Sequence, residues 1–210
     1  PATGVVRWGQ LFGPSPALAI AEAAAAAAHP VMVICSSAQA VERLEAELDF
    51  LLAGSDVPVF PFPEWETLPY DVFSPHQDII SRRLATLHRL QSLERGVVIT
   101  TAGSLLDRIA PRKWLDGASF VMAKGDRLDV ESFRARLEAA GYNAVAQVME
   151  HGEFAVRGSL FDVFPMGSPV PFRIDLFDDE IDSIRSFDPE TQLSREKLDS
   201  VRLLPAREFP

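Results

Sequence analysis

Two arginines lie among apolar residues in segments that have the composition of β-strands. Arg157 begins the first segment, residues 157–165, and Arg173 lies near the start of the second, residues 171–188. A charge among apolar neighbours is costly unless it is paired or meets a partner. These residue types offer binding chemistry and no nucleophile, so the two segments predict a binding surface.

Phosphate chemistry has only a weak candidate. A phosphate loop needs the pattern G-x-x-x-x-G-K-[ST], because backbone N–H groups surround the phosphates while a lysine reaches the outer ones. Residues 9–16 read GQLFGPSP, without the lysine, and Pro14 and Pro16 remove N–H donors. No lysine precedes Lys113, and no acidic pair follows residues 31–34 or 97–99. We therefore expect no cofactor-binding residues in this part of the chain.

Metal and nucleophile chemistry is equally weak. The histidines are scattered, with none four positions from another or beside a cysteine, which disfavours zinc and suggests surface or capping roles; they are His29, His76, His88 and His151. An acidic cluster at residues 175–182 lacks the ordered spacing of a calcium loop and suggests a solvated turn. Ser159 and Ser183 have no triad signature. We predict no catalytic and no metal-binding residue.

The elements that would position the arginines fall into two parts, divided near residue 118. Before it, short β-branched runs at 31–34 and 97–99 alternate with helical patterns at about 41–51 and 80–90. Strands that alternate with helices indicate a parallel sheet in an α/β layer. After residue 118, a strand at 120–122 and a helix between Asp129 and Gly141 lead into strands, which predicts a smaller α+β domain.

A proline-rich and aromatic connection, residues 60–78, links elements of the first part. Prolines hold such a segment extended and deny it ladder hydrogen bonds, so a long packed loop is the simpler interpretation. An aromatic groove for single-stranded nucleic acid is the alternative. The segment carries acids and no Lys or Arg, which disfavours that groove.

Composition narrows the class of protein. The 210 residues are 47% hydrophobic and 24% charged, enough for two domains of about 100 residues. The net charge of −10 argues against broad phosphate neutralisation. A single cysteine, Cys35, excludes a disulfide framework and fits a reducing cytoplasm. No stretch reaches the ~20 apolar residues of a membrane span, no secretory signal is visible, and the abrupt ending suggests a fragment.

Four segments together resemble the bacterial transcription-repair-coupling factor family (Mfd). They are WETLPYD at 65–71, SPHQDIISRRL at 74–84, MEHGEFA at 149–155 and DDEIDSIR at 178–185. The resemblance covers nearly the whole chain and implies the amino-terminal module similar to the excision-repair protein UvrB. It implies a degenerate P-loop-NTPase-like domain 1A at 1–118, domain 2 at 119–204, and the start of a link toward domain 1B at 205–210.

The resemblance also implies a function. In this family domain 2 recruits UvrA, and the contact residues correspond to Arg157, Arg173 and Phe177. The fragment would be non-catalytic and cytoplasmic, and it would bring UvrA to a lesion-stalled RNA polymerase in transcription-coupled nucleotide excision repair. RNA polymerase, DNA, ATP and Mg would be bound by missing domains of an ATP-dependent DNA translocase. The DNA-clamping hairpin of UvrB-like proteins has no room at residues 70–76.

Alternative interpretations of the same residues remain. Both arginines could pair with local acids such as Asp175 and Asp178, with Phe177 in the core. The first domain could retain nucleotide binding, which titration with Mg-ATP would detect. The module could bind nucleic acid, which would give a salt-sensitive shift of labelled DNA.

Overall fold

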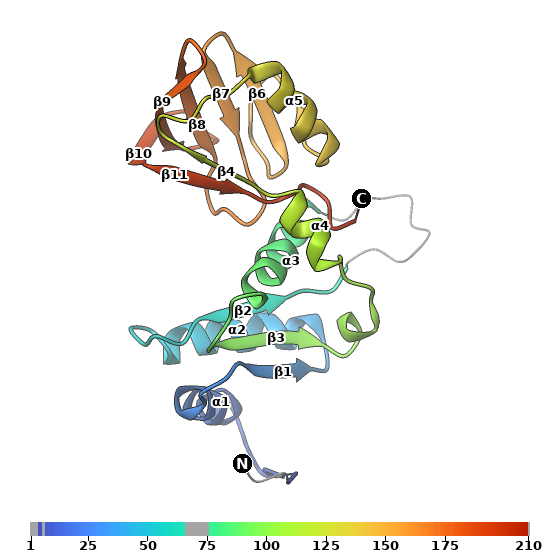
Figure 1. The fold of residues 1–210 in the computed structure, drawn as a ribbon. Helices are drawn as coiled ribbons and strands as arrows, with labels where there is room; N and C mark the ends of the chain where they lie inside the picture. The colour runs from blue at the N-terminus through green and yellow to red at the C-terminus, as the bar shows by residue number, and fades with distance from the viewer. Residues whose placement is uncertain (1–3, 6, 66–75, 210) are drawn as a thin grey trace. The chain divides into compact units, whose positions relative to one another are not determined.

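A computed structural model describes residues 4–5, 7–65 and 76–209 (Figure 1). The chain divides into two compact units, one of Pro1–Glu64 with Ser92–Leu106 and one of Trp65–Gln91 with Asp107–Pro210. The division near residue 118 would place the helix at 77–90 with the first part, whereas it groups here with the second unit.

The first unit contains a three-stranded parallel sheet. Its strands are β1 (Val31–Cys35), β2 (Val59–Phe62) and β3 (Val97–Thr101), in the order β1-β3-β2. The helices are α1 (Ser15–Ala26) and α2 (Ala38–Leu51), and a 3-10 turn, η1 (Ser104–Leu106), follows β3. The prediction of a parallel α/β layer is confirmed by the parallel pairs β1–β3 and β2–β3.

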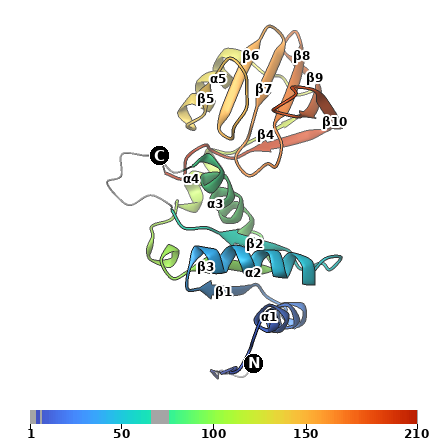
Figure 2. The same ribbon diagram turned by 180° about the vertical axis from the view of Figure 1, so that it is seen from behind.

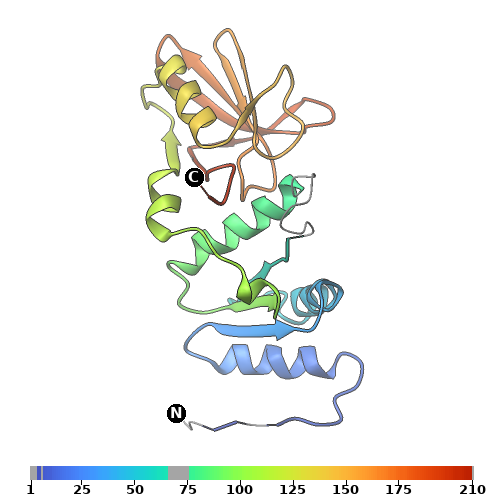
Figure 3. The same cartoon turned by 90° about the vertical axis from the view of Figure 1, so that its right-hand side faces the viewer.

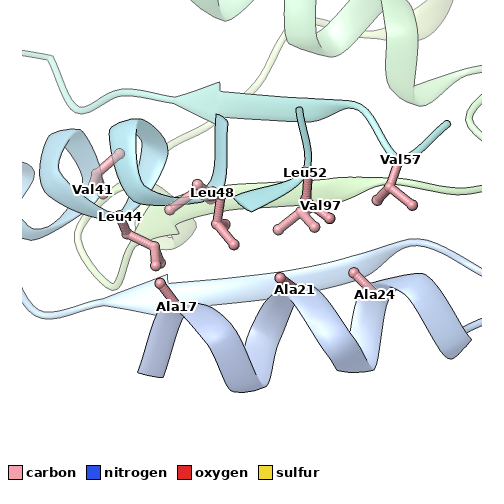
Figure 4. Packing of buried hydrophobic residues seen from close by; sticks show 10 residues of the cluster. Ala17, Ala21, Ala24, Val41, Leu44, Leu48, Leu52, Val57 and Val97 are labelled. Atoms are coloured by element: carbon pink, nitrogen blue, oxygen red, sulfur yellow. The ribbon is translucent and has the colours of Figure 1, made fainter. Parts of the chain in front are cut away.

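Small and large apolar side chains complement one another in the core of this unit. Alanines of α1 point toward the leucines of α2, with Val97 of β3 in the same cluster (Figure 4). The alanines allow the two helices to approach closely, and the branched side chains of α2 and β3 fill the remaining volume. The cluster comprises Ala17, Ala21, Ala24, Val41, Leu44, Leu48, Leu52, Val57, Val97 and Ile99.

The connection predicted as a long loop at 60–78 begins as a strand and ends as a helix. Residues Phe60, Pro61 and Phe62 belong to β2 and pair with β3, and residues 77 and 78 belong to a helix. Pro61 is tolerated because β2 is an edge strand, where a missing N–H breaks no ladder on the open side. The loop prediction is wrong for these residues, and residues 66–75, with the predicted absence of a hairpin, lie outside the described part.

The second unit is built on a six-stranded sheet of order β10-β9-β8-β7-β6-β5, whose strands follow one another as neighbouring ribbons (Figure 2). All neighbours are antiparallel except β5 and β6. The strand-rich character predicted after residue 118 is therefore confirmed. The prediction that this domain is the smaller one is wrong, because the second unit also includes Trp65–Gln91 and is the larger of the two. The strands are β5 (Asn143–Ala144), β6 (Glu153–Arg157), β7 (Leu160–Val163), β8 (Phe172–Phe177), β9 (Glu180–Phe187) and β10 (Ser194–Leu198).

Helix α5 (Val130–Ala139) lies across one face of this sheet (Figure 3). Asp129 caps its first turn by accepting a hydrogen bond from the backbone N–H of Ser132. The helix ends with the backbone hydrogen bonds Gly141 N–H to Glu138 O and Tyr142 N–H to Leu137 O, and Gly141 adopts φ +95°. The predicted N-cap is confirmed, and the C-cap is Ala140, one residue before the predicted Gly141.

The remaining elements of the second unit are α3 (Gln77–Leu90), α4 (Arg112–Gly117) and the antiparallel pair β4 (Phe120–Ala123) and β11 (Ser200–Leu203). On α3, Arg83 is fully buried and donates from Nε to Glu208 over 2.8 Å. Ala206 donates its backbone N–H to Ala140 O. Residues 205–209, predicted as the start of a link, are thus held within this unit by specific contacts.

A tight turn joins β8 to β9. Phe177 pairs with Glu180, so only Asp178 and Asp179 lie between the strands. Asp178 adopts φ 60°, a left-handed conformation that Asp tolerates better than most residues. The register of β8 and β9 shifts between Asp175 and Leu176, which marks an extra residue on β9.

Candidate functional site

The six-stranded sheet of the second unit has two unlike faces. On the inner face, Phe161 of β7 packs edge-on against Phe133 of α5, with ring centroids 5.3 Å apart. Ile174 and Leu176 of β8 are buried on the same side. Because side chains alternate along a strand, Asp162, Arg173, Asp175 and Phe177 lie on the outer face.

Both arginines predicted as site residues converge on one carboxylate of this outer face. Arg173 donates from Nε and Nη2 to the two oxygens of Asp162, over 2.8 and 2.9 Å. Arg157, from the neighbouring strand β6, donates from Nη2 to the same carboxylate. Asp162 is only 1% exposed, so a buried acid holds two guanidinium groups side by side.

The two arginines differ in how far they remain available. Arg173 is 16% exposed, donates from Nη1 to Gln192 O over 3.0 Å, and lies over the Phe187 ring. Hydrogen bonds to Asp162 raise the pKa of Arg173 above its ordinary value, more than burial lowers it. Arg157 is 47% exposed, and among the described residues its guanidinium pairs with Asp162 alone. Arg173 therefore fixes the arrangement, and Arg157 presents charge to solvent.

Phe177 completes the surface. It is the last residue of β8, and its side chain is 80% exposed. A large aromatic ring in this position contributes little to the core and offers apolar area to a partner. The alternative that placed Phe177 in the core is therefore wrong.

The structure brings the three predicted residues onto one face of one sheet. The pairing of the arginines with an acid, expected in the alternative interpretation, does occur, but the acid is Asp162 in place of Asp175 or Asp178. Sequence reasoning missed Asp162 and Gln192. Asp162 carried the same signal as the arginines, a charge between the apolar residues Phe161 and Val163.

Other chemistry finds little support in the geometry. Within residues 4–5, 7–65 and 76–209, no group of three His, Cys, Asp or Glu side chains is placed to hold a metal ion. The described residues before α1 contain no strand, so they lack the strand–loop–helix arrangement of a phosphate loop, and Pro14 is the N-cap of α1. His76 caps α3 by accepting from the N–H of Asp78, as the capping interpretation of the histidines expects. None of the helices in the described ranges is both long and apolar enough to span a membrane.

Comparison with known proteins gives one family model and a set of full-length relatives. The model described as the UvrB interaction domain matches residues 120–209. The transcription-repair-coupling factors of Escherichia coli K12 and Haemophilus influenzae are each 48% identical over 202 residues, 96% of this chain and 17% of each relative. That of Bacillus subtilis is 29% identical over 180 residues, 86% of this chain and 15% of the relative.

The chain spans about a sixth of the length of the curated relatives that it matches. The match at 120–209 contains all of β6 to β10, and with them Arg157, Arg173, Phe177 and Asp162.

Proposed function

The chain belongs to the transcription-repair-coupling factor family, and we propose that its second unit is a docking module for UvrA. One observation carries this proposal: the outer face of β6–β8 presents Arg157, Arg173 and an exposed Phe177 inside the match to a UvrB interaction domain. Arginines and aromatic residues dominate the binding energy of protein interfaces.

The arrangement around Asp162 supports the proposal physically. A guanidinium fixed by a two-point contact loses little freedom when a partner binds, because its geometry is already set. Asp162 and Gln192 hold Arg173 in this way. Arg157 keeps its exposed half for a partner carboxylate, and the Phe177 ring supplies an apolar contact beside the two charges.

The first unit contributes no residue to the proposed docking surface. We propose that it derives from a P-loop-NTPase-like fold that has lost its chemistry. The parallel order β1-β3-β2 and the absence of a lysine in residues 9–16 support this view. Isothermal titration with Mg-ATP at millimolar concentration is expected to give no heat of binding, and measurable affinity would contradict the loss.

In the complete protein, the module would deliver repair to the transcribed strand. We propose that it presents the second unit to UvrA after a lesion-stalled RNA polymerase has been engaged, in the bacterial cytoplasm. Polymerase binding and ATP-driven translocation on DNA would belong to parts of the relatives that this chain does not cover. The module itself recruits and does not catalyse.

The direct test measures binding of purified UvrA to this chain by calorimetry. Arg157→Ala and Phe177→Ala are each expected to weaken binding by about 1–4 kcal/mol, with unchanged circular dichroism. Phe50→Ala is the matched control, since Phe50 is also a phenylalanine with 81% exposure but lies on α2 of the first unit. Unchanged binding by both folded site variants, Arg157→Ala and Phe177→Ala, would overturn the proposed site.

A further inference from the structure

The register of the sheet places four charged residues in one row across the outer face. Asp162 of β7 lies opposite Arg173 of β8, Arg173 opposite Arg185 of β9, and Arg185 opposite Lys197 of β10. Directly opposite residues on antiparallel strands share a face, so these side chains are neighbours. The row therefore continues from Asp162 and Arg173 to two further cations, Arg185 and Lys197.

This row is not balanced in charge. Like charges opposite one another destabilise a sheet, and the carboxylate of Asp162 already binds Arg157 and Arg173. Among the described residues, neither Arg185 nor Lys197 forms a salt bridge. The row thus holds three cations and one carboxylate in a chain whose net charge is −10.

Unpaired hydrogen-bond donors occur at the same place. Nε of Arg185 is buried and, within the described ranges, has no hydrogen-bond partner; the same holds for Oγ of Ser183. Ser183 lies opposite Asp175 on the outer face, two residues before Arg185 on the same strand. An unmade hydrogen bond of a buried donor costs free energy. A partner's acceptor would recover it once these side chains turn toward the surface.

We infer that Ser183, Arg185 and Lys197 extend the docking surface across β9 and β10, and that the partner covers this part with an acidic protein segment. This inference rests on the proposed function, because it assigns further contacts to the same partner. A carboxylate accepts from both a guanidinium and a hydroxyl, so one Asp or Glu can satisfy the two unpaired donors. A second acid would meet Lys197, whose side chain is exposed at the edge strand.

An acidic protein segment fits better than a nucleic acid. Four cations on this face lie near two carboxylates, Asp162 and Asp175, and the chain as a whole is acidic. Affinity for nucleic acid comes mainly from an extended surplus of positive charge, which is lacking here. A short acidic segment needs only the few cations of this row to bind.

The test compares variants by calorimetry with purified UvrA at low and at physiological salt. Arg185→Gln is expected to weaken binding about tenfold and to reduce its salt dependence, and Arg185→Glu to weaken it further. Arg134→Gln is the matched control, because Arg134 is an exposed arginine of the same unit on α5, away from the outer face. Far- and near-ultraviolet circular dichroism of each variant checks that the sheet and its aromatic packing are intact.

The outcomes separate this inference from the proposed function. Folded Arg185→Gln and Lys197→Gln chains that bind UvrA within twofold of wild type, while Arg157→Ala loses binding, would overturn the inference and leave the proposed function standing. If Arg157→Ala and Phe177→Ala are also neutral, the proposed function itself fails. Binding of a labelled DNA oligonucleotide that Arg185→Gln abolishes would overturn the acidic protein segment as the occupant.

Discussion

The two faces of the six-stranded sheet are built from the same strands but have different roles. The inner face buries aromatic and branched side chains beneath α5, with Phe154, Phe161 and Ile174 almost inaccessible to water. The outer face holds a buried carboxylate between two arginines and an exposed phenylalanine. The outer face also has a smaller buried cluster that includes Ala155 and Phe187. Alternation along a strand thus separates most of the residues that stabilise the unit from those that can meet a partner, and Asp162 belongs to both groups.

The largest expected effect is on the inner face. Phe161→Ala should lower the free energy of unfolding of the second unit by about 3–5 kcal/mol, because it removes a ring that is 0% exposed and leaves a cavity. Hydrogen exchange of the β6–β8 amides in urea measures this loss. Phe177→Ala should change the same quantity by less than about 0.5 kcal/mol, and equal losses for the two variants would erase the distinction between the faces.

The next effect tests the residue that belongs to both groups. Asp162→Ala should lower the free energy of unfolding by about 3 kcal/mol, because it leaves Arg173 largely buried without its counter-charge. Binding of UvrA should fall as well, since both guanidinium groups lose their anchor. The free energy of unfolding of Asp162→Asn, which keeps one acceptor oxygen, should lie between those of wild type and Asp162→Ala. A variant as stable as wild type would show that solvent holds the arginines equally well.

A smaller effect distinguishes the two arginines from each other. Arg173→Ala should reduce both stability and UvrA binding, with about 1.5–3 kcal/mol lost from stability, because it removes charge-assisted hydrogen bonds to Asp162 and Gln192. Arg157→Ala should reduce binding with little change in stability, since its side chain is half exposed. Thermal unfolding and calorimetry on the same samples check this, and a reversed order would refute the division of roles.

The smallest effect concerns the helix that covers the inner face. Hydrogen bonds from the side chain and backbone of Ser132 lower the pKa of Asp129 below its usual value. The ionised cap therefore contributes stability above the unfolded pKa of about 4, and this contribution is lost as the pH falls through the lower folded pKa. The Tm difference between wild type and Asp129→Ala should narrow between pH 7 and strongly acidic pH. A constant difference would assign the cap no electrostatic role.

Local patterns predicted the elements of this chain well. Asp129 and Gly141 marked the limits of α5, because a capping carboxylate and a left-handed glycine act within a few residues of the helix. The β-branched runs predicted β1 and β3, because the strand preference of such residues is also a local property. Pro61 led to the wrong prediction of a loop at residues 60–62. Its effect depends on whether β2 is an edge or a central strand, and strand order is a property of the whole sheet.

The candidate site was predictable in its residues and less so in its contacts. Arg157, Arg173 and Phe177 followed from a resemblance, and their common face follows from alternation once the strands are placed. The choice of Asp162 over Asp175 as the shared acid depends on the register of β6, β7 and β8. Register is set by turns and by burial of the opposite face, neither of which the charged residues themselves reveal.

The two-residue turn between β8 and β9 has a consequence for the kinetics of recognition. Phe177 is paired with Glu180 at the mouth of this turn, so its backbone is fixed before any partner arrives. A ring on a long loop would surrender conformational entropy on binding, whereas this ring has only its own rotamers left to order. The encounter can therefore proceed as a rigid docking event, in which the association rate depends on diffusion and charge more than on folding of the module.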